Sequence, residues 1–133
     1  MQLKKSGLIV VILSWGVLSL ELTEQMKNDG MDLLEPHIQS GLGLALQATN
    51  DNNKFWSREN YWVIQAISTI KTPKTKFVIE KVGDNVIRLI DNYTGYYLHG
   101  SVDENDLPFL YAKKTTPDID CNFEVYEFDG KLV

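Results

Sequence analysis

Short runs of apolar and aromatic residues, separated by turns rich in Asn, Asp and Gly, begin at residue 42. Each of the first four runs has the length of a strand, and β-branched and aromatic residues are frequent in them. The last of the four alternates most clearly, with Phe77 and Ile79 on one face. We therefore predict an all-β domain of many short strands, the first four near residues 44–47, 54–57, 62–66 and 77–82.

The pattern then repeats at spacings of 42 to 46 residues. One such four-strand unit cannot bury both of its faces alone, so several units must share a core. A propeller needs at least about four blades, which this chain is too short to supply, so the better fit is an incomplete β-trefoil with two lobes and the first strand of a third. The corresponding segments are 44–46 and 86–90, 49–56 and 91–98, 63–66 and 109–112, 72–73 and 116–117, and 77–79 and 123–125.

Several positions are apolar in both copies, which predicts that they belong to the core. The turn between the first two strands of each copy places Asn53 and Gly95 in the same slot, which suits a residue with a positive φ. The paired core positions are Trp56 with Leu98, Phe77 with Phe123, Ile79 with Val125, and Ile64 with Leu110.

The N-terminal part of the chain has a different pattern. Lys4 and Lys5 precede a continuous apolar run over residues 8–20, and these 13 residues are fewer than the roughly 20 that a membrane-spanning helix needs. The length and the basic flank are typical of a secretory signal. Residues 1–21 are therefore a candidate signal or anchor that forms an apolar helix and could contact a membrane through 8–20, with a buried helix as the alternative.

Residues 22–41 connect this segment to the β-rich part. Some of their apolar spacings are helical, but residues 28–30 (Asn-Asp-Gly) interrupt the pattern and Pro36 ends it. We predict a linker with a short helix here, followed by a partial β-trefoil domain at residues 42–133.

Composition and charge exclude several classes of function. The 133 residues are 44% hydrophobic, which suits one modest globular domain. The net charge of −5 offers no basic field to gather phosphates, so nucleic acid is not expected as a partner. The single cysteine, Cys121, excludes a disulfide framework within the chain and a zinc site of several thiolates.

Enzyme chemistry finds little support in the sequence. Only two histidines occur, His37 and His99, and neither lies near Cys121 in the sequence. The carboxylates at residues 103, 104 and 106 fall on an inserted loop and are interpreted as a solvated surface. We therefore predict no catalytic activity, no cofactor and no metal.

Residues 45–56, 76–80 and 86–98 together resemble the amaranthin-like agglutinin domain of plants. Residues 61–66 are similar to the Trp-containing strand of the same family. The resemblance covers about residues 42–133 and lacks most of the third lobe. It implies a non-catalytic β-trefoil lectin that binds galactose- or N-acetylgalactosamine-type glycans, commonly as a dimer.

Candidate sugar contacts follow from the chemistry of such sites, in which an aromatic face meets the ring and Asp or Asn groups bind the hydroxyls. Trp62 fits a core position equally well because it shares parity with Ile64. Polar neighbours predict that Tyr61 and Tyr93 are exposed. The candidate carbohydrate-binding residues are Asn60, Tyr61 and Trp62 in one loop and Asp91, Asn92, Tyr93 and His99 in the second repeat.

The same sequence also allows other functions and two different compartments. The same fold could serve as a fascin-like protein-interaction module, or the chain could be a truncated, inactive agglutinin. The expected partner is a glycan or glycoprotein, and a homo-oligomer or another chain could complete the missing lobe. The compartment is secretory or membrane-associated if residues 8–20 act as a signal or anchor, whereas the resemblance implies a cytoplasmic or nuclear protein.

Overall fold

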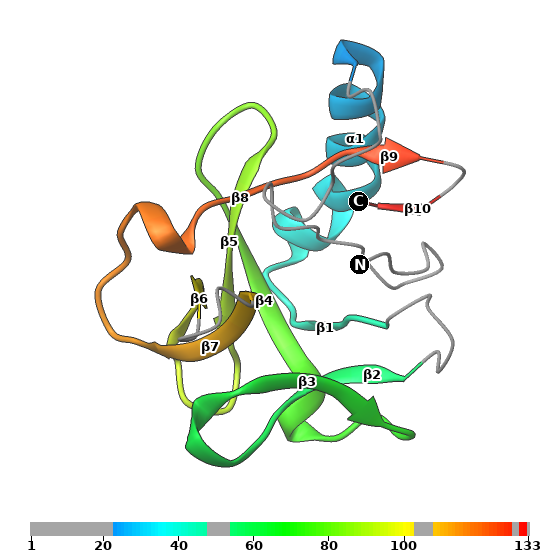
Figure 1. Cartoon of the computed structure of the whole chain (residues 1–133). Helices are drawn as coiled ribbons and strands as arrows, with labels where there is room; N and C mark the ends of the chain where they lie inside the picture. The colour runs from blue at the N-terminus through cyan, green and yellow to red at the C-terminus, as the bar shows by residue number, and fades with distance from the viewer. Residues whose placement is uncertain (1–22, 48–53, 103–107, 129–130, 133) are drawn as a thin grey trace.

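The computed structural model describes residues 23–47, 54–102, 108–128 and 131–132. One helix, α1 (Glu24–Ser40), precedes a series of short strands (Figure 1). The prediction of a largely β chain is therefore confirmed. The strands are β1 (Leu44–Ala45), β2 (Phe55–Arg58), β3 (Ile64–Ser68), β4 (Lys76–Lys81), β5 (Val86–Asp91), β6 (Tyr97–Val102), β7 (Pro108–Lys114), β8 (Phe123–Glu124), β9 (Glu127–Phe128) and β10 (Lys131–Leu132).

The strands form an open antiparallel sheet with two small accessory sheets. The main sheet has the order β1-β4-β5-β6-β7, and β8 pairs with β5 beside this path. The hairpin β2–β3 and the pair β9–β10 are separate two-stranded sheets. Among the described residues all of these pairings are antiparallel, which agrees with the short turns between the strands.

The two sequence copies have the same internal pairing. The first strand pairs with the fourth in each copy, β1 with β4 and β5 with β8. The second and third form a hairpin in each copy, and Trp56 faces Ala66 as Leu98 faces Ala112. Both hairpins also shift register at the equivalent place, between residues 55 and 56 and between 97 and 98. The predicted duplication therefore extends to backbone pairing and to the position of a β-bulge.

The core is made from the positions that the two copies share. Strands β4 and β5 alternate buried and more exposed residues, as half-buried strands of an antiparallel sheet do. The predicted turn conformation is confirmed at Gly95, which has φ 79°, whereas Asn53 lies outside the described residues. All eight paired positions are buried: Trp56, Leu98, Phe77, Phe123, Ile79, Val125, Ile64 and Leu110.

Helix α1 corrects the prediction of a linker with a short helix. The helix has 17 residues, and its residues Met31 and Leu34 belong to the main hydrophobic core. Thr23 caps its first turn by accepting a hydrogen bond from the Met26 N–H (3.2 Å), and Gly41 ends it with φ 67°. Pro36 removes one backbone hydrogen bond but does not end the helix, because the packed apolar face stabilises it.

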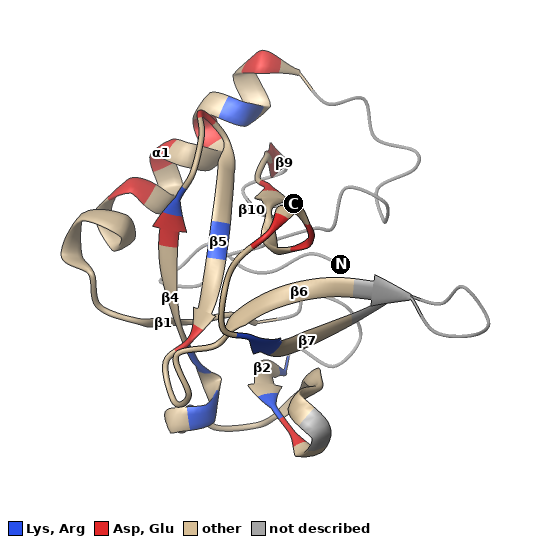
Figure 2. Ribbon diagram, turned by 90° about the vertical axis from the view of Figure 1, so that its left-hand side faces the viewer, with Lys and Arg blue, Asp and Glu red and all other residues tan. Residues whose placement is uncertain are grey.

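The helix joins opposite ends of the described chain. It packs beside β9 and against β4, and Figure 1 shows the blue helix next to the red end of the chain. Acidic residues recur along the helix, as the red segments of α1 in Figure 2 show. The predicted signal or anchor segment, residues 1–21, lies outside the described residues. In the part of the chain that the structure describes, no helix has the length and apolar character needed to cross a membrane.

Candidate binding surface on two adjacent loops

An ion pair joins the two loops that carry the predicted site residues. Asp91 ends β5 and is fully buried, and Arg58 ends β2 with a side chain that is 14% exposed. The Arg58 Nε lies 2.9 Å from the Asp91 Oδ2. This contact connects the β2–β3 loop, residues 59–63, to the β5–β6 turn, residues 91–96, although the two segments belong to different repeats.

The carboxylate of Asp91 also organises its own turn. It accepts hydrogen bonds from the Thr94 hydroxyl (2.6 Å) and from the Tyr93 N–H (3.3 Å). The backbone closes around it, because the Gly95 N–H donates to the Asp91 carbonyl (2.7 Å) and the Asp91 N–H donates to the Tyr96 carbonyl (2.8 Å). Burying a carboxylate is costly unless it is paired and hydrogen-bonded, and these contacts meet that need. Asp91 therefore holds the turn in place from the protein interior, and its side chain is not exposed for contact with a sugar.

Tyr93 lies at the tip of this turn with its ring exposed. The Arg58 guanidinium sits 5.2 Å from the centre of the ring, which is a cation–π distance. Tyr93 is nevertheless 61% exposed, so its predicted exposure is confirmed. An aromatic ring supported on one side by a fixed cation and open to solvent on the other is suited to stacking against a ligand.

Trp62 occupies the neighbouring loop in an unusual conformation. It ends the short 3-10 helix η2 (Asn60–Trp62), has φ 62° and is 44% exposed. A positive φ is uncommon for a bulky residue and costs of order 1–3 kcal/mol, and such strain is often found at functional sites. Hydrogen bonds hold the loop, from the Glu59 N–H to the Val63 carbonyl (2.7 Å) and from the Ser57 hydroxyl to Glu59 Oε2 (2.7 Å).

Three of the seven predicted sugar contacts are exposed on these two loops. They are Asn60, Trp62 and Tyr93, which we call the aromatic loop surface. Asn92 is exposed but lines a separate pocket beside Lys76. The side chain of Tyr61 lies outside what the structure describes.

His99 does not reach this surface. It lies on β6, is 6% exposed and stacks on Tyr111 of β7, with ring centres 5.7 Å apart. Its Nε2 is buried and has no hydrogen-bond partner among the described residues. Burial, and secondly the charge of Lys114, lower the pKa of His99 below its usual value. Tyr111 in turn faces Val63 across an isolated bridge, so His99 belongs to the layer beneath the β2–β3 loop.

The described ranges also bear on metal binding and on cysteine chemistry. No three His, Cys, Asp or Glu side chains cluster there in a way that could hold a metal ion. Cys121 is buried, and burial raises the pKa of its thiol, which disfavours the nucleophilic thiolate. The predicted carboxylate cluster at residues 103–106 lies outside the described residues.

Arg58 is the functional residue that the candidate set omits. Its partner, Asp91, belongs to the other repeat, so only the three-dimensional arrangement of the two copies brings the charges together. A signal was present in the sequence, because Arg58 and Asp91 each directly follow a predicted strand and precede an aromatic residue of the next loop.

Comparison with known proteins supplies no relative for this chain: no family model, no curated protein and no solved structure matches it. Function is therefore inferred from the described geometry and from the resemblance of the repeated segments.

Proposed function

We propose that this chain is a non-catalytic carbohydrate-binding module of the lectin type, with the aromatic loop surface as its glycan contact. The observation that carries the proposal is the pair of exposed rings, Trp62 and Tyr93, on two loops that the Arg58–Asp91 ion pair fixes to each other. Sugar rings present apolar C–H faces for stacking, and their hydroxyls can bind amides such as that of Asn60.

The proposed fold is an incomplete β-trefoil of the amaranthin-like agglutinin type. Support comes from the repeated pairing, in which the first strand binds the fourth and the second and third form a hairpin in both copies. Strand β10 would then correspond to β5, as the first strand of a third lobe, and β9 to the end of β4.

The sugar class comes from the resemblance, which implies galactose- or N-acetylgalactosamine-type glycans on a glycan or glycoprotein partner. The site itself is consistent with a neutral ligand. Its surface groups are aromatic rings and an amide, and the two charged groups beneath them, Arg58 and Asp91, neutralise each other.

A glycan array probed with the full chain, followed by titration with galactose and N-acetylgalactosamine, tests the proposal. Trp62→Ala and Tyr93→Ala should each weaken binding by roughly tenfold, the loss of about 1.4 kcal/mol of stacking. Ile119→Ala is the matched control, because Ile119 is an exposed apolar residue (81%) on a different turn. The proposal would be contradicted if the folded protein bound no glycan. Co-sedimentation with actin filaments that added sugar does not reduce would also contradict it, and would favour a fascin-like module.

A further inference from the structure

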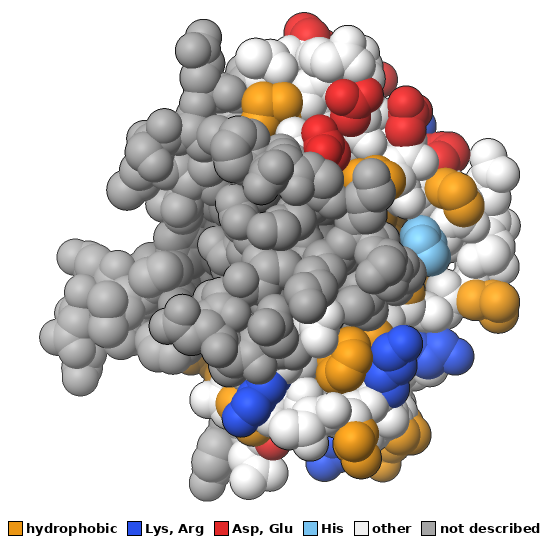
Figure 3. Space-filling model, turned by 90° about the vertical axis from the view of Figure 1, so that its right-hand side faces the viewer, with side chains coloured by type: hydrophobic (Ala, Val, Ile, Leu, Met, Phe, Trp, Pro, Cys, Tyr) orange, Lys and Arg blue, Asp and Glu red, His pale blue; other side chains and the backbone are white. Residues whose placement is uncertain are grey.

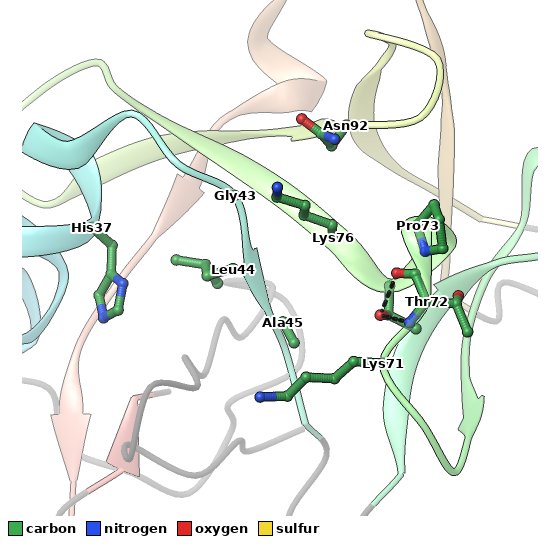
Figure 4. Close-up of a pocket in the computed structure, with 10 residues that line it drawn as sticks. His37, Gly43, Leu44, Ala45, Lys71, Thr72, Pro73, Lys76 and Asn92 are labelled. Atoms are coloured by element: carbon green, nitrogen blue, oxygen red, sulfur yellow. Dashed lines mark hydrogen bonds between the residues drawn. The ribbon is translucent and has the colours of Figure 1, made fainter.

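A pocket lies beside the β5–β6 turn, which contributes Asn92 to its lining. It is a pocket of about 610 Å³, which lies within the usual range for small-molecule sites and is far larger than a single inorganic ion needs. The end of α1, strand β1, the short helix η3 (Pro73–Thr75) and the start of β4 surround it (Figure 4). Its lining residues, which we call the basic pocket, are His37, Gly43, Leu44, Ala45, Lys71, Thr72, Pro73, Thr75, Lys76 and Asn92.

The charge of this pocket is opposite to that of the chain. Lys71, Lys76 and His37 line it, and none of its lining residues is Asp or Glu, although the chain carries a net charge of −5. Neither lysine forms an ion pair with a carboxylate of the described residues, whereas Lys27, Lys81 and other cations do. Figure 3 shows most of the basic side chains on this face gathered apart from the acidic ones. The pocket therefore concentrates positive charge that no carboxylate of the described residues neutralises.

The two lysines are held in place by different contacts. The stem of Lys76 lies directly across Gly43, where an added Cβ would come within 2.6 Å of the Lys76 Cε. The Lys71 ammonium lies 5.8 Å from the centre of the Phe55 ring, at a cation–π distance. Glycine at position 43 thus lets a long cationic side chain rest on the strand that forms the wall of the pocket.

Neutral groups complete the lining. The Asn92 N–H donates to the Lys76 carbonyl (3.1 Å), which places the Asn92 side chain at the rim, and its amide makes no hydrogen bond within the described residues. The hydroxyl oxygen of Thr72 accepts from the Lys74 N–H (3.2 Å), so its proton remains available for donation. The buried side chains of Leu44 and Ala45 provide an apolar wall.

We propose that the basic pocket binds a small organic anion. The carboxylate or phosphate of the ligand lies among the Lys71, Lys76 and His37 side chains, and its carbon skeleton rests on Leu44 and Ala45. The size of the pocket and its apolar wall favour an organic molecule. Lys71 and Lys76, which form no ion pair with the described carboxylates, favour a negative charge on it. This site is independent of the aromatic loop surface, since Trp62 and Tyr93 do not line it.

Titration calorimetry of the full chain at low salt, with four organic probes and with inorganic phosphate as a fifth, tests this inference. Galacturonate and citrate represent carboxylates, galactose 6-phosphate represents phosphate esters, and neutral galactose reports only on the proposed lectin site. We expect at least one of the anions to bind through the basic pocket, with affinity that falls as salt is added because partly exposed charges are screened. Which probe binds more tightly distinguishes a carboxylate ligand from a phosphate ligand, and either result supports the proposal.

Variants locate the binding. Lys71→Gln with Lys76→Gln should weaken anion binding by about tenfold or more, since a charge-assisted hydrogen bond contributes about 1.5–3 kcal/mol. Lys74→Gln is the matched control, because Lys74 lies on η3, between the two lysines in the sequence, but does not line the pocket. Gly43→Ala keeps every charge and displaces the Lys76 stem, so a weaker affinity there would show that the geometry matters and not only the charge.

Three outcomes would overturn the inference. They are no binding of any anion, an equal loss of affinity in Lys74→Gln, and inorganic phosphate binding as tightly as the organic probes. Failure here is distinguishable from failure of the lectin proposal, because Trp62→Ala should leave the binding of citrate, which has no sugar ring, unchanged, and the lysine variants should leave galactose binding unchanged.

Discussion

Gly30 of α1 touches the backbone of Tyr126, just before β9. A Cβ added at residue 30 would lie 2.9 Å from the Tyr126 carbonyl carbon and 3.0 Å from its Cα. Both atoms are backbone, so they cannot move aside as the end of a flexible side chain can. Gly30 therefore sets how closely the helix approaches the C-terminal part of the described chain.

Gly30→Ala should destabilise the protein even though alanine favours helices. Alanine adds up to about 1 kcal/mol of helix stability, while overpacking against a backbone costs about 1–3 kcal/mol. We expect a net loss of about 1–2 kcal/mol in the free energy of unfolding, measured by urea denaturation. Asn28→Ala, at an exposed position of the same helix, should be neutral or stabilising. A Gly30→Ala protein at least as stable as the parent would contradict the close packing of α1 on this segment.

Asp91→Asn should be strongly destabilising. It removes the charge that pairs with Arg58 while leaving that cation largely buried, and breaking a buried pair from one side costs about 3 kcal/mol. The measurement is the midpoint of chemical denaturation, and Asp84→Asn is the control because Asp84 is exposed. Equal midpoints for the two variants would mean that the ion pair does not hold the loops together.

Because of His99, we expect the folded protein to lose stability in mild acid. The pKa of His99 is lowered in the folded protein by burial, from the ordinary value of 6.5. Below pH 6.5 the unfolded chain therefore binds a proton that the folded chain does not, and stability falls as pH decreases toward the lowered pKa. The slope reaches at most about 1.4 kcal/mol per pH unit for one proton. In denaturation curves across this range, His99→Gln should remove the effect and His37→Gln should retain it.

Because of Tyr126, we expect a second loss of stability at alkaline pH. Burial, and then a hydrogen bond to Glu124 (2.6 Å), raise the pKa of Tyr126 from 10.0 to about 12. The unfolded chain releases this proton first, so stability should fall between pH 10 and about 12, by about 2–3 kcal/mol in all. Tyr126→Phe should reduce the alkaline loss. Tyr93→Phe, at an exposed ring, should not change it, and the same curve for both variants would count against this assignment.

The core could be predicted from the sequence because equivalent positions of the two repeats can be compared. Trp56 and Leu98 occupy equivalent positions of the two copies. What the two side chains share is apolar character, which indicates a core position, and both residues are buried. Strands β4 and β5 were predictable for a related reason. Each lies half-buried in an antiparallel sheet, which produces alternation that can be read locally.

The helix was not predicted at its full length because its stability is not local. Its interior contains Gly30 and Pro36, which weaken an isolated helix, and the packing that offsets them involves Tyr126 near the other end of the described chain. Contacts at that sequence separation leave no periodic signal in a short window.

The candidate site was predicted in part. The parity argument that allowed Trp62 in the core assumes an extended backbone from 62 to 64, but φ 62° at Trp62 breaks the alternation and turns its ring outward. The Arg58–Asp91 ion pair and the basic pocket combine residues from separate segments. Their chemistry is visible in the sequence, and their proximity depends on the arrangement of the strands.

The contact between Gly30 and Tyr126 also orders the events of biosynthesis. The helix emerges from the ribosome before both of the strands on which it packs, β4 and then β9, so its two contacts form at different times. Until translation passes residue 128, the contact with β4 can form but the contact of Gly30 with Tyr126 cannot. A helix near the start of the described chain is therefore among the last elements to complete its packing.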